Sequence, residues 1–225
     1  MTTLSLRRLT VTLGAIALAA LQACGAPLQA APLPAPNTDL PKASTPGTQT
    51  AVFAGGCFWG VEAVFRHVKG VKTAVSGYAG GDAGTANYMT VSSGLTKHAE
   101  SVQVTFDPSQ VSYGELLRIF FSVAHDPTQL DRQGPDHGPQ YRSAVFYVDD
   151  EQKRVAQAYI EQLSSAKAFT QPIVTQVVAL PKFYAAEDYH QDYLAKHPTQ
   201  PYIVYNDMPK LAALKEQFPS RYVGR

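Results

Sequence analysis

The sequence predicts an α+β fold, a two-layer sandwich in which helices pack on a mixed β-sheet. Two observations lead to this prediction. Strand-like and helix-like segments follow one another in the order β-α-β-β-α-β-α-β. The chain has 225 residues, 45% of them hydrophobic, and it shows neither an internal repeat nor a second linker beyond residue 50. This composition indicates one domain with a sizeable core.

Three strands and one helix are predicted in the first half of this domain. Residues 50–56, "TAVFAGG", are β-branched and aromatic and end in glycines, which is typical of a strand and the turn after it. Apolar residues recur at helical spacing over residues 57–68. Residues 71–81 predict a strand that enters a glycine loop, and residues 99–108 alternate as a strand does until a proline ends it.

The second half begins with a helix over residues 112–124, whose start matches a capping box of Ser112 and Glu115. Residues 125–141, rich in proline, glycine and aspartate, predict a long surface loop of the kind that is often functional. The remaining elements are a strand over 143–148, a helix over 150–168, a strand over 173–180 and a tail over 183–222 with one or two helices. The βαββαβ order of the core is that of a ferredoxin-like fold with extra helices and a long C-terminal tail.

Residues 1–24 predict a signal peptide. Arg7 and Arg8 precede an apolar run of 13 residues that is too short to span a bilayer as a helix. The segment ends in "LQAC", which resembles the lipobox of bacterial lipoproteins, in which the cysteine becomes lipidated. Lipidation at Cys24 and plain cleavage to a free periplasmic protein are both compatible with the sequence. Either outcome predicts a location in the periplasm or cell envelope.

A linker is predicted between this segment and the domain. Residues 25–48 contain six of the chain's 16 prolines, mixed with Ala, Thr and Ser. Such a composition cannot bury enough apolar surface to fold alone and favours an extended spacer. The catalytic domain is therefore expected over residues 49–225.

Composition and motif spacing exclude several classes of function. The formal net charge is +1 and no run of Lys/Arg exceeds two residues, which gives no indication of a nucleic-acid partner. The glycine loop 80–88 lacks the Gly-Lys-Ser/Thr ending of a phosphate-binding loop. His190 and His197 lie seven residues apart without a third ligand at suitable spacing, so no metal site is predicted. We also expect no tightly bound cofactor.

Cys57 is the candidate reactive group. It is one of two cysteines, and it lies between a predicted strand and a predicted helix in "GGCFWG" (55–60). A sulfur at a helix start faces unpaired backbone N–H groups, which lower the pKa of a thiol and so increase its thiolate fraction. Flanking glycines permit a tight turn, and Phe58 and Trp59 can form an apolar wall. A small buried hydrophobe is the alternative interpretation of Cys57.

"GCFWG" followed by a helix resembles the active-site motif of the A-type peptide methionine sulfoxide reductases. The resemblance extends over most of residues 50–195. The matching stretches, in order, are "GYAGG" (77–81), "NYMTVSSGLTKHAESVQVTFDP" (87–108), "FFSVAHDPTQLDRQGPDHGPQYRSAVFY" (120–147) and "FYAAEDYHQDYL" (183–194).

The resemblance implies a role for each matching residue. Cys57 corresponds to the nucleophile, and Glu100 to the acidic residue that protonates the sulfoxide oxygen. Tyr88 and Tyr141 correspond to the two oxygen-binding tyrosines, and Asp136 to the loop carboxylate. Phe58 and Trp59 match the apolar slot for the methyl group of the substrate. The implied reaction is thiol-dependent reduction of methionine S-sulfoxide, free or in proteins, through a sulfenic acid on Cys57.

One feature departs from this family, since many members carry resolving cysteines near the C-terminus. From Phe58 to Arg225 this chain has no cysteine, and Cys24 lies 33 residues before Cys57. We therefore expect an external thiol, either a thioredoxin-like protein or a small molecule, to reduce the sulfenic acid. The expected enzyme is a monomer that contacts the membrane only through a lipid on Cys24.

Three other functions remain possible at the level of sequence. A different thiol redox enzyme is disfavoured because CxxC is absent. A cysteine hydrolase could pair Cys57 with His98 or His190, although a lone histidine is more often structural. A non-catalytic envelope lipoprotein would not need a cysteine with glycines on both sides, as in "GGCFWG".

Overall fold

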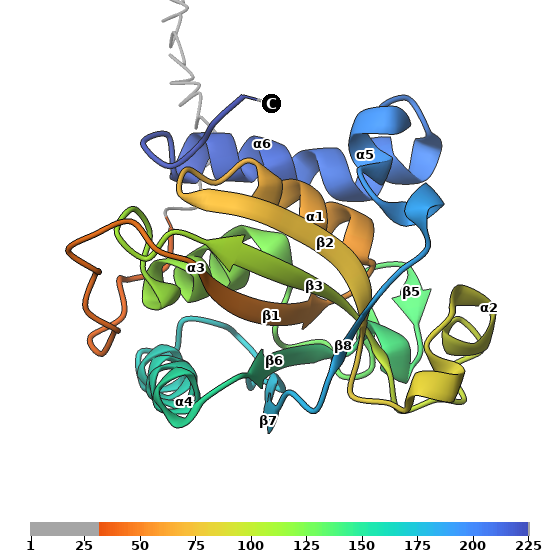
Figure 1. The fold of residues 1–225 in the computed structure, drawn as a ribbon, viewed down its shortest axis with the longest axis horizontal. Helices are drawn as coiled ribbons and strands as arrows, with labels where there is room; N and C mark the ends of the chain where they lie inside the picture. Colours follow the sequence, from red (N-terminus) through yellow and green to blue (C-terminus); the bar gives the residue numbers. More distant parts are fainter. Residues whose placement is uncertain (1–31, 225) are drawn as a thin grey trace, which may run out of the picture. The chain divides into compact units, whose positions relative to one another are not determined.

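A six-stranded mixed sheet forms the centre of the protein, in the order β7-β6-β1-β3-β2-β8 (Figure 1). The computed structural model describes residues 32–224. Neighbouring strands are antiparallel except β6 and β7, which are parallel. The strands of this sheet are β1 (Gln49–Gly55), β2 (Val71–Ala79), β3 (Ala99–Phe106), β6 (Ser143–Tyr147), β7 (Gln176–Ala179) and β8 (Phe183–Ala185). The four inner strands, β6-β1-β3-β2, follow the predicted βαββαβ topology.

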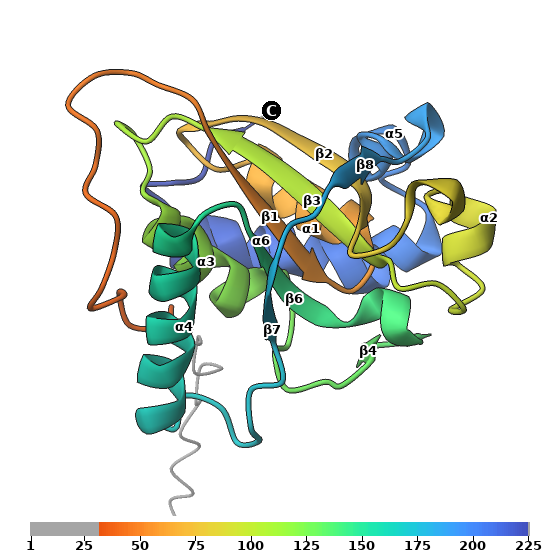
Figure 2. The same ribbon diagram turned by 60° about the horizontal axis from the view of Figure 1, so that its bottom comes forward.

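The helices gather on one side of this sheet. Figures 1 and 2 show α1 and α6 side by side over the sheet and α4 next to α3, and these pairs are in contact. The helices are α1 (Phe58–Arg66), α2 (Tyr88–Val91), α3 (Tyr113–Ile119), α4 (Asp150–Ser165), α5 (Tyr193–Lys196) and α6 (Met208–Gln217). Two π-helical turns adjoin them, Phe120–Ala124 after α3 and Ile203–Asp207 before α6.

Alternation along β1 explains the two layers. Ala51 and Phe53 belong to the large core under the helices, whereas Val52 and Ala54 belong to a smaller cluster on the other face. Successive strand side chains point to opposite faces of a sheet. The ring of Phe53 stacks on that of Phe65 in α1, with centroids 5.0 Å apart. The predicted α+β two-layer sandwich is confirmed.

The predicted elements are present, with shifts at their ends. The capping box is confirmed: Glu115 N–H donates to Ser112 Oγ (3.1 Å), and Ser112 N–H donates to Glu115 Oε2 (2.9 Å). The loop 125–141 carries a short hairpin of β4 (Arg132–Gln133) and β5 (Asp136–His137) and a 3₁₀ turn, Pro139–Tyr141. Sequence periodicity missed α2 and β8, since elements of three or four residues are too short to show a period.

Residues 32–48, the described part of the expected spacer, are bonded to the domain. They contain neither helix nor strand, yet their polar groups bond to the domain. Arg118 Nε donates to Leu33 O (2.6 Å), and Gly114 N–H donates to Asp39 Oδ1 (2.7 Å) at the start of α3. The segment is therefore attached to the surface of α3 and α4.

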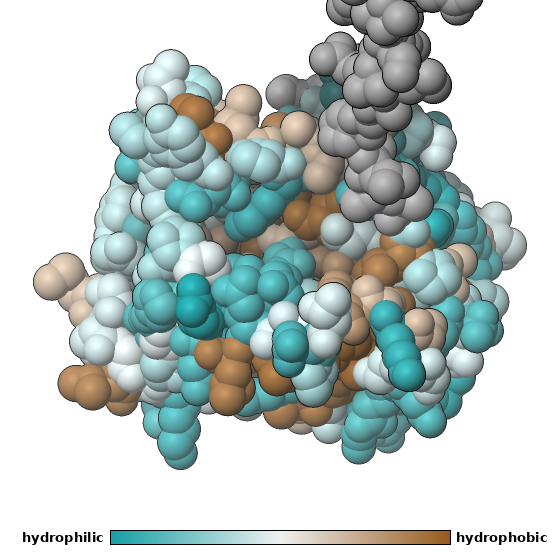
Figure 3. All heavy atoms as spheres, turned by 180° about the vertical axis from the view of Figure 1, so that it is seen from behind, coloured by the Kyte–Doolittle hydropathy of each residue, from teal (hydrophilic) through white to brown (hydrophobic). Residues whose placement is uncertain are grey.

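Other predictions about the N-terminal region concern residues that the structure does not describe. The signal peptide 1–24, the first part of the linker and the lipidation of Cys24 lie among them and stay predictions. Within residues 32–224, no helix is long and apolar enough to cross a membrane. The face shown in Figure 3 mixes hydrophilic and hydrophobic residues rather than presenting one continuous apolar patch.

Candidate functional site

Cys57 lies at the N-cap of α1, directly after β1. The turn before it requires glycine, because Gly56 has a φ of +86° and a Cβ atom there would lie 2.5 Å from the Gln133 side chain. The side chain of Cys57 is only 7% exposed. The predicted strand-to-helix position of this thiol is confirmed.

The electrostatic environment of the thiol differs from the sequence prediction. Burial raises the pKa of Cys57 well above its ordinary value, and the carboxyl groups of Glu100 and Asp207 raise it further. The backbone N–H of Trp59 at the helix start and the ammonium of Lys210 lower this pKa, but by less. The prediction that the pKa of this thiol is lowered is therefore wrong. A buried sulfur loses more hydration energy on ionisation than one helix turn returns.

Glu100 is the second titratable group of the site. It lies at the start of β3, is 2% exposed, and its Oε2 accepts a hydrogen bond from the Phe58 N–H (3.1 Å). Burial raises the pKa of this carboxyl to about 8, with smaller contributions from Asp136 and Asp207, while the Phe58 N–H opposes the shift. Glu100 is therefore protonated at neutral pH and can donate a proton.

A cavity of about 270 Å³ brings the predicted residues together. All seven residues proposed for catalysis and substrate binding line it, together with two residues that sequence reasoning missed. The lining residues are Cys57, Phe58, Trp59, Tyr88, Glu100, Asp136, Tyr141, Gln200 and Tyr202. Nothing in the sequence marked Tyr202 among 12 tyrosines.

Tyr88 is held by a carboxylate from the C-terminal region. Its backbone N–H, at the start of α2, donates to Glu187 Oε1 (2.9 Å), and the Tyr78 hydroxyl donates to Glu187 Oε2 (2.8 Å). Glu187 thus links α2 to β2. Burial raises the pKa of the Tyr88 phenol, so its hydroxyl stays protonated and can donate a hydrogen bond.

Tyr141 and Glu100 are connected through the neighbouring Arg142. Its guanidinium donates to the carbonyl oxygens of Lys97 (2.8 Å) and His98 (3.1 Å), directly before β3, and to that of Pro139 (2.8 Å). These bonds attach the 3₁₀ turn of Tyr141 to the strand that carries Glu100. Burial also raises the pKa of the Tyr141 phenol.

Asp136 lies in the loop hairpin, on β5. The loop is fixed by Gln133, whose amide donates to Asp126 O (3.0 Å) and accepts from the Asp126 N–H (3.1 Å). The hydroxyl of Tyr202 donates to Asp136 Oδ2. This contact joins the loop to the C-terminal segment at the edge of the cavity.

Trp59 is held on three sides. Its ring stacks on Tyr193 at 3.7 Å with an interplanar angle of 7°, and the ring of Tyr202 meets it edge-on at 5.8 Å. Its Nε1–H donates to His190 Nδ1 (3.2 Å), so His190 is a neutral ring whose pKa burial lowers. His190 also packs on Phe58 at 5.0 Å.

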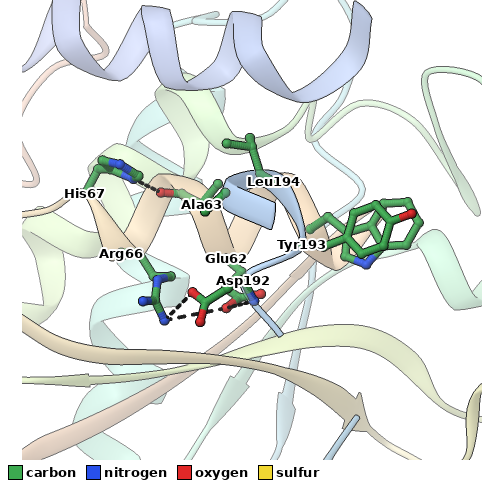
Figure 4. Close-up of a pocket in the computed structure, with 9 residues that line it drawn as sticks. Glu62, Ala63, Arg66, His67, Asp192, Tyr193 and Leu194 are labelled. Atoms are coloured by element: carbon green, nitrogen blue, oxygen red, sulfur yellow. Dashed lines mark hydrogen bonds and ion pairs between the residues drawn. The ribbon is translucent and has the colours of Figure 1, made fainter. Parts of the chain in front are cut away.

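An ionic cluster beside this stack holds Tyr193 in place. Figure 4 shows Glu62, Arg66 and Asp192 pointing toward one another beneath α1. Arg66 pairs with Asp192 at 2.7 Å, and the buried Glu62 accepts from the Asp192 N–H (3.0 Å) and the Ser76 hydroxyl (2.8 Å). The position of Trp59 therefore depends on contacts made by residues remote in the sequence.

Gly60 permits a further close contact. A Cβ atom at this position would lie 2.1 Å from Asp207 Oδ1. Asp207, fully buried at the π-turn before α6, bonds to Lys210 Nζ (3.1 Å). The last glycine of "GGCFWG" thus allows the C-terminal segment to bring a carboxyl group close to Cys57.

The histidines are not placed for hydrolysis. His98 Nε2 lies 3.0 Å from Asp82 O, His190 is bound to Trp59, and neither lines the cavity at Cys57. Among residues 32–224 no group of three or more His, Cys, Asp or Glu side chains is arranged to hold a metal ion.

Known sequences that resemble this chain belong to one family. The sequence profile of the family described as Peptide methionine sulfoxide reductase matches residues 49–222. A relative from Mesorhizobium japonicum, Peptide methionine sulfoxide reductase MsrA 2, is 60% identical over 80% of this chain and 92% of its own length. One of the same name from Synechocystis is 55% identical over 84% of this chain and 89% of its own length.

Solved structures show the same likeness. Reduced Mxr1 from Saccharomyces cerevisiae matches with a TM-score of 0.61 and 32% identity, over 70% of this chain and 92% of that one. Methionine sulfoxide reductase A of Corynebacterium diphtheriae matches with a TM-score of 0.59 and 34% identity, over 77% of this chain and 89% of that one. The predicted resemblance is confirmed, and the chain belongs to the peptide methionine sulfoxide reductase family.

Proposed function

We propose that this enzyme reduces the S epimer of methionine sulfoxide through a sulfenic acid on Cys57. The reduction of methionine sulfoxide follows from the family. The finer mechanism is supported by one observation above the others: the buried thiol of Cys57 and the buried acid Glu100 line a single cavity with aromatic walls.

In the first step the sulfoxide oxygen is held by the protonated Glu100 and the hydroxyls of Tyr88 and Tyr141. The sulfur of Cys57 bonds to the substrate sulfur, while Glu100 gives its proton to the oxygen and takes the thiol proton. The hydroxyl then moves from the substrate sulfur to the Cys57 sulfur as the S–S bond breaks and leaves its electron pair on the methionine sulfur. The products are methionine and Cys57 sulfenic acid, so the substrate gains the two electrons that the thiol loses.

The raised pKa of the thiol is compatible with this step. A neutral thiol beside a neutral carboxylic acid avoids two buried negative charges. As the sulfoxide oxygen takes the proton of Glu100, the resulting carboxylate can accept the thiol proton. Phe58 and Trp59 supply the apolar contact for the methyl group, and Asp136 with Tyr202 closes the edge of the cavity.

In the second step an external thiol regenerates Cys57. Among residues 32–224, Cys57 is a free cysteine with no second cysteine to resolve it. One thiol converts the sulfenic acid to a mixed disulfide with release of water, and a second thiol releases Cys57 and a disulfide.

The proposal is tested by assaying each methionine sulfoxide epimer with dithiothreitol as reductant. We expect methionine from the S epimer alone and a sulfenic acid on Cys57 that dimedone traps when the thiol is withheld. Activity on neither epimer contradicts the function, and activity without a trappable sulfenic acid contradicts the intermediate.

We also propose that the enzyme acts as a monomer in the cell envelope, where it repairs oxidised proteins. The location is supported by the signal-like segment 1–24 and the lipobox-like "LQAC" at Cys24. Cell fractionation of the wild type and of Cys24→Ser tests this location. A lipid anchor predicts membrane association that the substitution removes, plain cleavage predicts a periplasmic protein in both cases, and a cytoplasmic wild type contradicts the proposal.

A further inference from the structure

A second cavity, of about 180 Å³, also reaches Cys57. Cys57, Asp136 and Tyr202 line both cavities, so the Tyr202–Asp136 hydrogen bond lies at the edge that they share. The proposed sulfoxide reduction gives this second cavity no task.

The two cavities differ in the residues that line them. The substrate cavity contains the aromatic rings of Phe58 and Trp59 and the acid Glu100. The second cavity is lined instead by residues of the loop hairpin, of the π-helical turn before α6 and of α6 itself. These residues are Gln133, Gly134, Pro135, Tyr205, Asn206 and Lys210.

The chemistry of the second step requires an approach of its own. A thiol attacks a sulfenic acid at sulfur, in line with the S–O bond that breaks. In the proposed intermediate the oxygen arises on the side of Glu100, Tyr88 and Tyr141, because these groups hold the sulfoxide oxygen. The incoming sulfur must therefore approach Cys57 Sγ from the side opposite that oxygen.

We propose that the second cavity, here termed the reductant cavity, admits a low-molecular-weight thiol to the sulfenic acid of Cys57. This inference rests on the proposed function. The thiol sulfur bonds to Cys57 Sγ while the S–O bond breaks, and the hydroxyl of the sulfenic acid leaves as water with the thiol proton. A second molecule of thiol then attacks the mixed disulfide and forms a small disulfide, and its proton restores the Cys57 thiol, so that two thiols supply two electrons.

Burial and lining favour a small thiol over a thiol on a protein surface. Cys57 is 7% exposed, so a cysteine on a broad protein surface could not reach it without displacing the rim. Tyr205 is 79% exposed and Gly134 is exposed, which leaves the mouth of the reductant cavity open to solvent.

Polar groups within the reductant cavity can bind the body of such a thiol. Lys210 Nζ donates one hydrogen bond to Asp207 Oδ1 (3.1 Å), and an ammonium has two further N–H groups. Asn206 Nδ2 donates to Tyr202 O (3.0 Å), and the same amide carries an acceptor oxygen.

The test separates the two steps in the variant Asn206→Phe, which fills the reductant cavity. The first step is measured as methionine formed per enzyme in the absence of thiol. The second is measured by mixing the sulfenic enzyme with 2-mercaptoethanol and following the loss of dimedone-trapped Cys57 by mass spectrometry. We expect the ratio of the second rate constant to the first to fall by about tenfold or more.

Thr170→Phe is the matched control, because Thr170 lines a separate cavity of about 630 Å³ beside the end of α4. In Thr170→Phe the rate constants of both steps should equal those of the wild type. If Asn206→Phe slows both steps equally, or slows neither, the proposed role of the reductant cavity is wrong. Absence of methionine in the wild-type first step overturns the proposed function instead.

A comparison on the wild type keeps the inference testable if Asn206→Phe does not fold. Rates of sulfenic acid reduction by 2-mercaptoethanol and by reduced thioredoxin are each divided by the rate of the same thiol with a small disulfide. We expect the normalised rate to be higher for 2-mercaptoethanol. A higher normalised rate for thioredoxin contradicts the assignment of a small thiol.

Discussion

The junction of β1 and α1 and the segment 200–210 both line the site, but they are built in different ways. At the junction, Phe58 is 1% exposed in the main core and its N–H bonds to Glu100 (3.1 Å). In the segment, Tyr202 and the buried Asp207 lie at the two ends of a π-helical turn, and Val204 and Tyr205 within that turn are 43% and 79% exposed.

This difference suggests a division of tasks. The junction places the reacting groups on a strand and a helix that the core holds rigidly. The segment supplies a carboxyl group, Asp207, that raises the pKa of Cys57. It also supplies Tyr202, whose hydrogen bond to Asp136 lies at the edge shared by the two cavities. Substitutions at the junction should therefore stop the reaction, and substitutions in the segment should modify it.

The largest effect is expected for Cys57→Ser. A serine hydroxyl is a far weaker nucleophile toward sulfur, so methionine formation should fall below detection while the fold is retained. The assay is methionine formation by chromatography, with near-UV circular dichroism as the control for folding. Activity close to that of the wild type would show that Cys57 is not the nucleophile.

Glu100→Gln should lower kcat/KM by about 10²- to 10⁴-fold, the range for loss of a general acid. The wild type should be active while Glu100 is protonated and lose activity as pH rises through about 8. The variant should lose that dependence, which a pH profile of kcat/KM measures. An unchanged alkaline limb in the variant would assign the titration to another group.

The same shift predicts a pH effect on stability. The pKa of Glu100 rises from an ordinary 4.5 to about 8 on folding, so the folded state holds a proton that the unfolded state releases. The free energy of unfolding should therefore decrease as pH rises from about 4.5 to about 8, and Glu100→Gln should remove this part of the decrease. Urea titrations at several pH values measure it.

An intermediate effect is expected for Asp207→Asn in the C-terminal segment. Because the carboxyl of Asp207 raises the pKa of Cys57, removing its charge should lower that pKa. The rate of Cys57 alkylation as a function of pH gives the pKa directly. The exposed Asp188→Asn is the control, and an equal shift in both variants would argue against a specific effect of the segment.

Tyr202→Phe should have a smaller effect, since it removes only the hydrogen bond to Asp136. A lost hydrogen bond costs about 0.5–1.5 kcal/mol, which corresponds to roughly a two- to tenfold decrease in kcat/KM. Tyr205→Phe is the matched control on the same turn, because its ring is 79% exposed and should tolerate the change. Equal losses in the two variants would contradict a role for the Asp136 contact.

The smallest effect on activity is expected away from both regions, at Asp39→Ala. Its carboxylate accepts from the Gly114 N–H (2.7 Å) and the Ser112 hydroxyl at the start of α3. Loss of such a helix-terminal contact lowers the free energy of unfolding by about 0.5–2 kcal/mol and should leave kcat/KM unchanged. Urea denaturation measures the change, with the exposed Ser44→Ala as control.

The sequence predicted the junction well because its signals are local. Alternation in residues 50–56, helical spacing after Cys57 and the glycines between them depend on near neighbours alone. The capping box at Ser112 and Glu115 belongs to the same class, and the structure contains it.

The segment 200–210 carried no comparable signal. Tyr202 bonds to Asp136, 66 residues away, and Asp207 packs against α1 only because Gly60 has no Cβ atom. The contacts of residues 32–48 carried no sequence signal for the same reason, since their partners lie on α3 and α4 rather than in the segment itself.

The sequence by itself determined the strand-to-helix position of Cys57, the order of the core elements and the family to which the chain belongs. Only the tertiary structure decided the protonation states of the site, because the pKa of Cys57 and that of Glu100 depend mainly on burial. Burial is a property of the packed chain, and the same packing leaves the two cavities that meet at the one thiol.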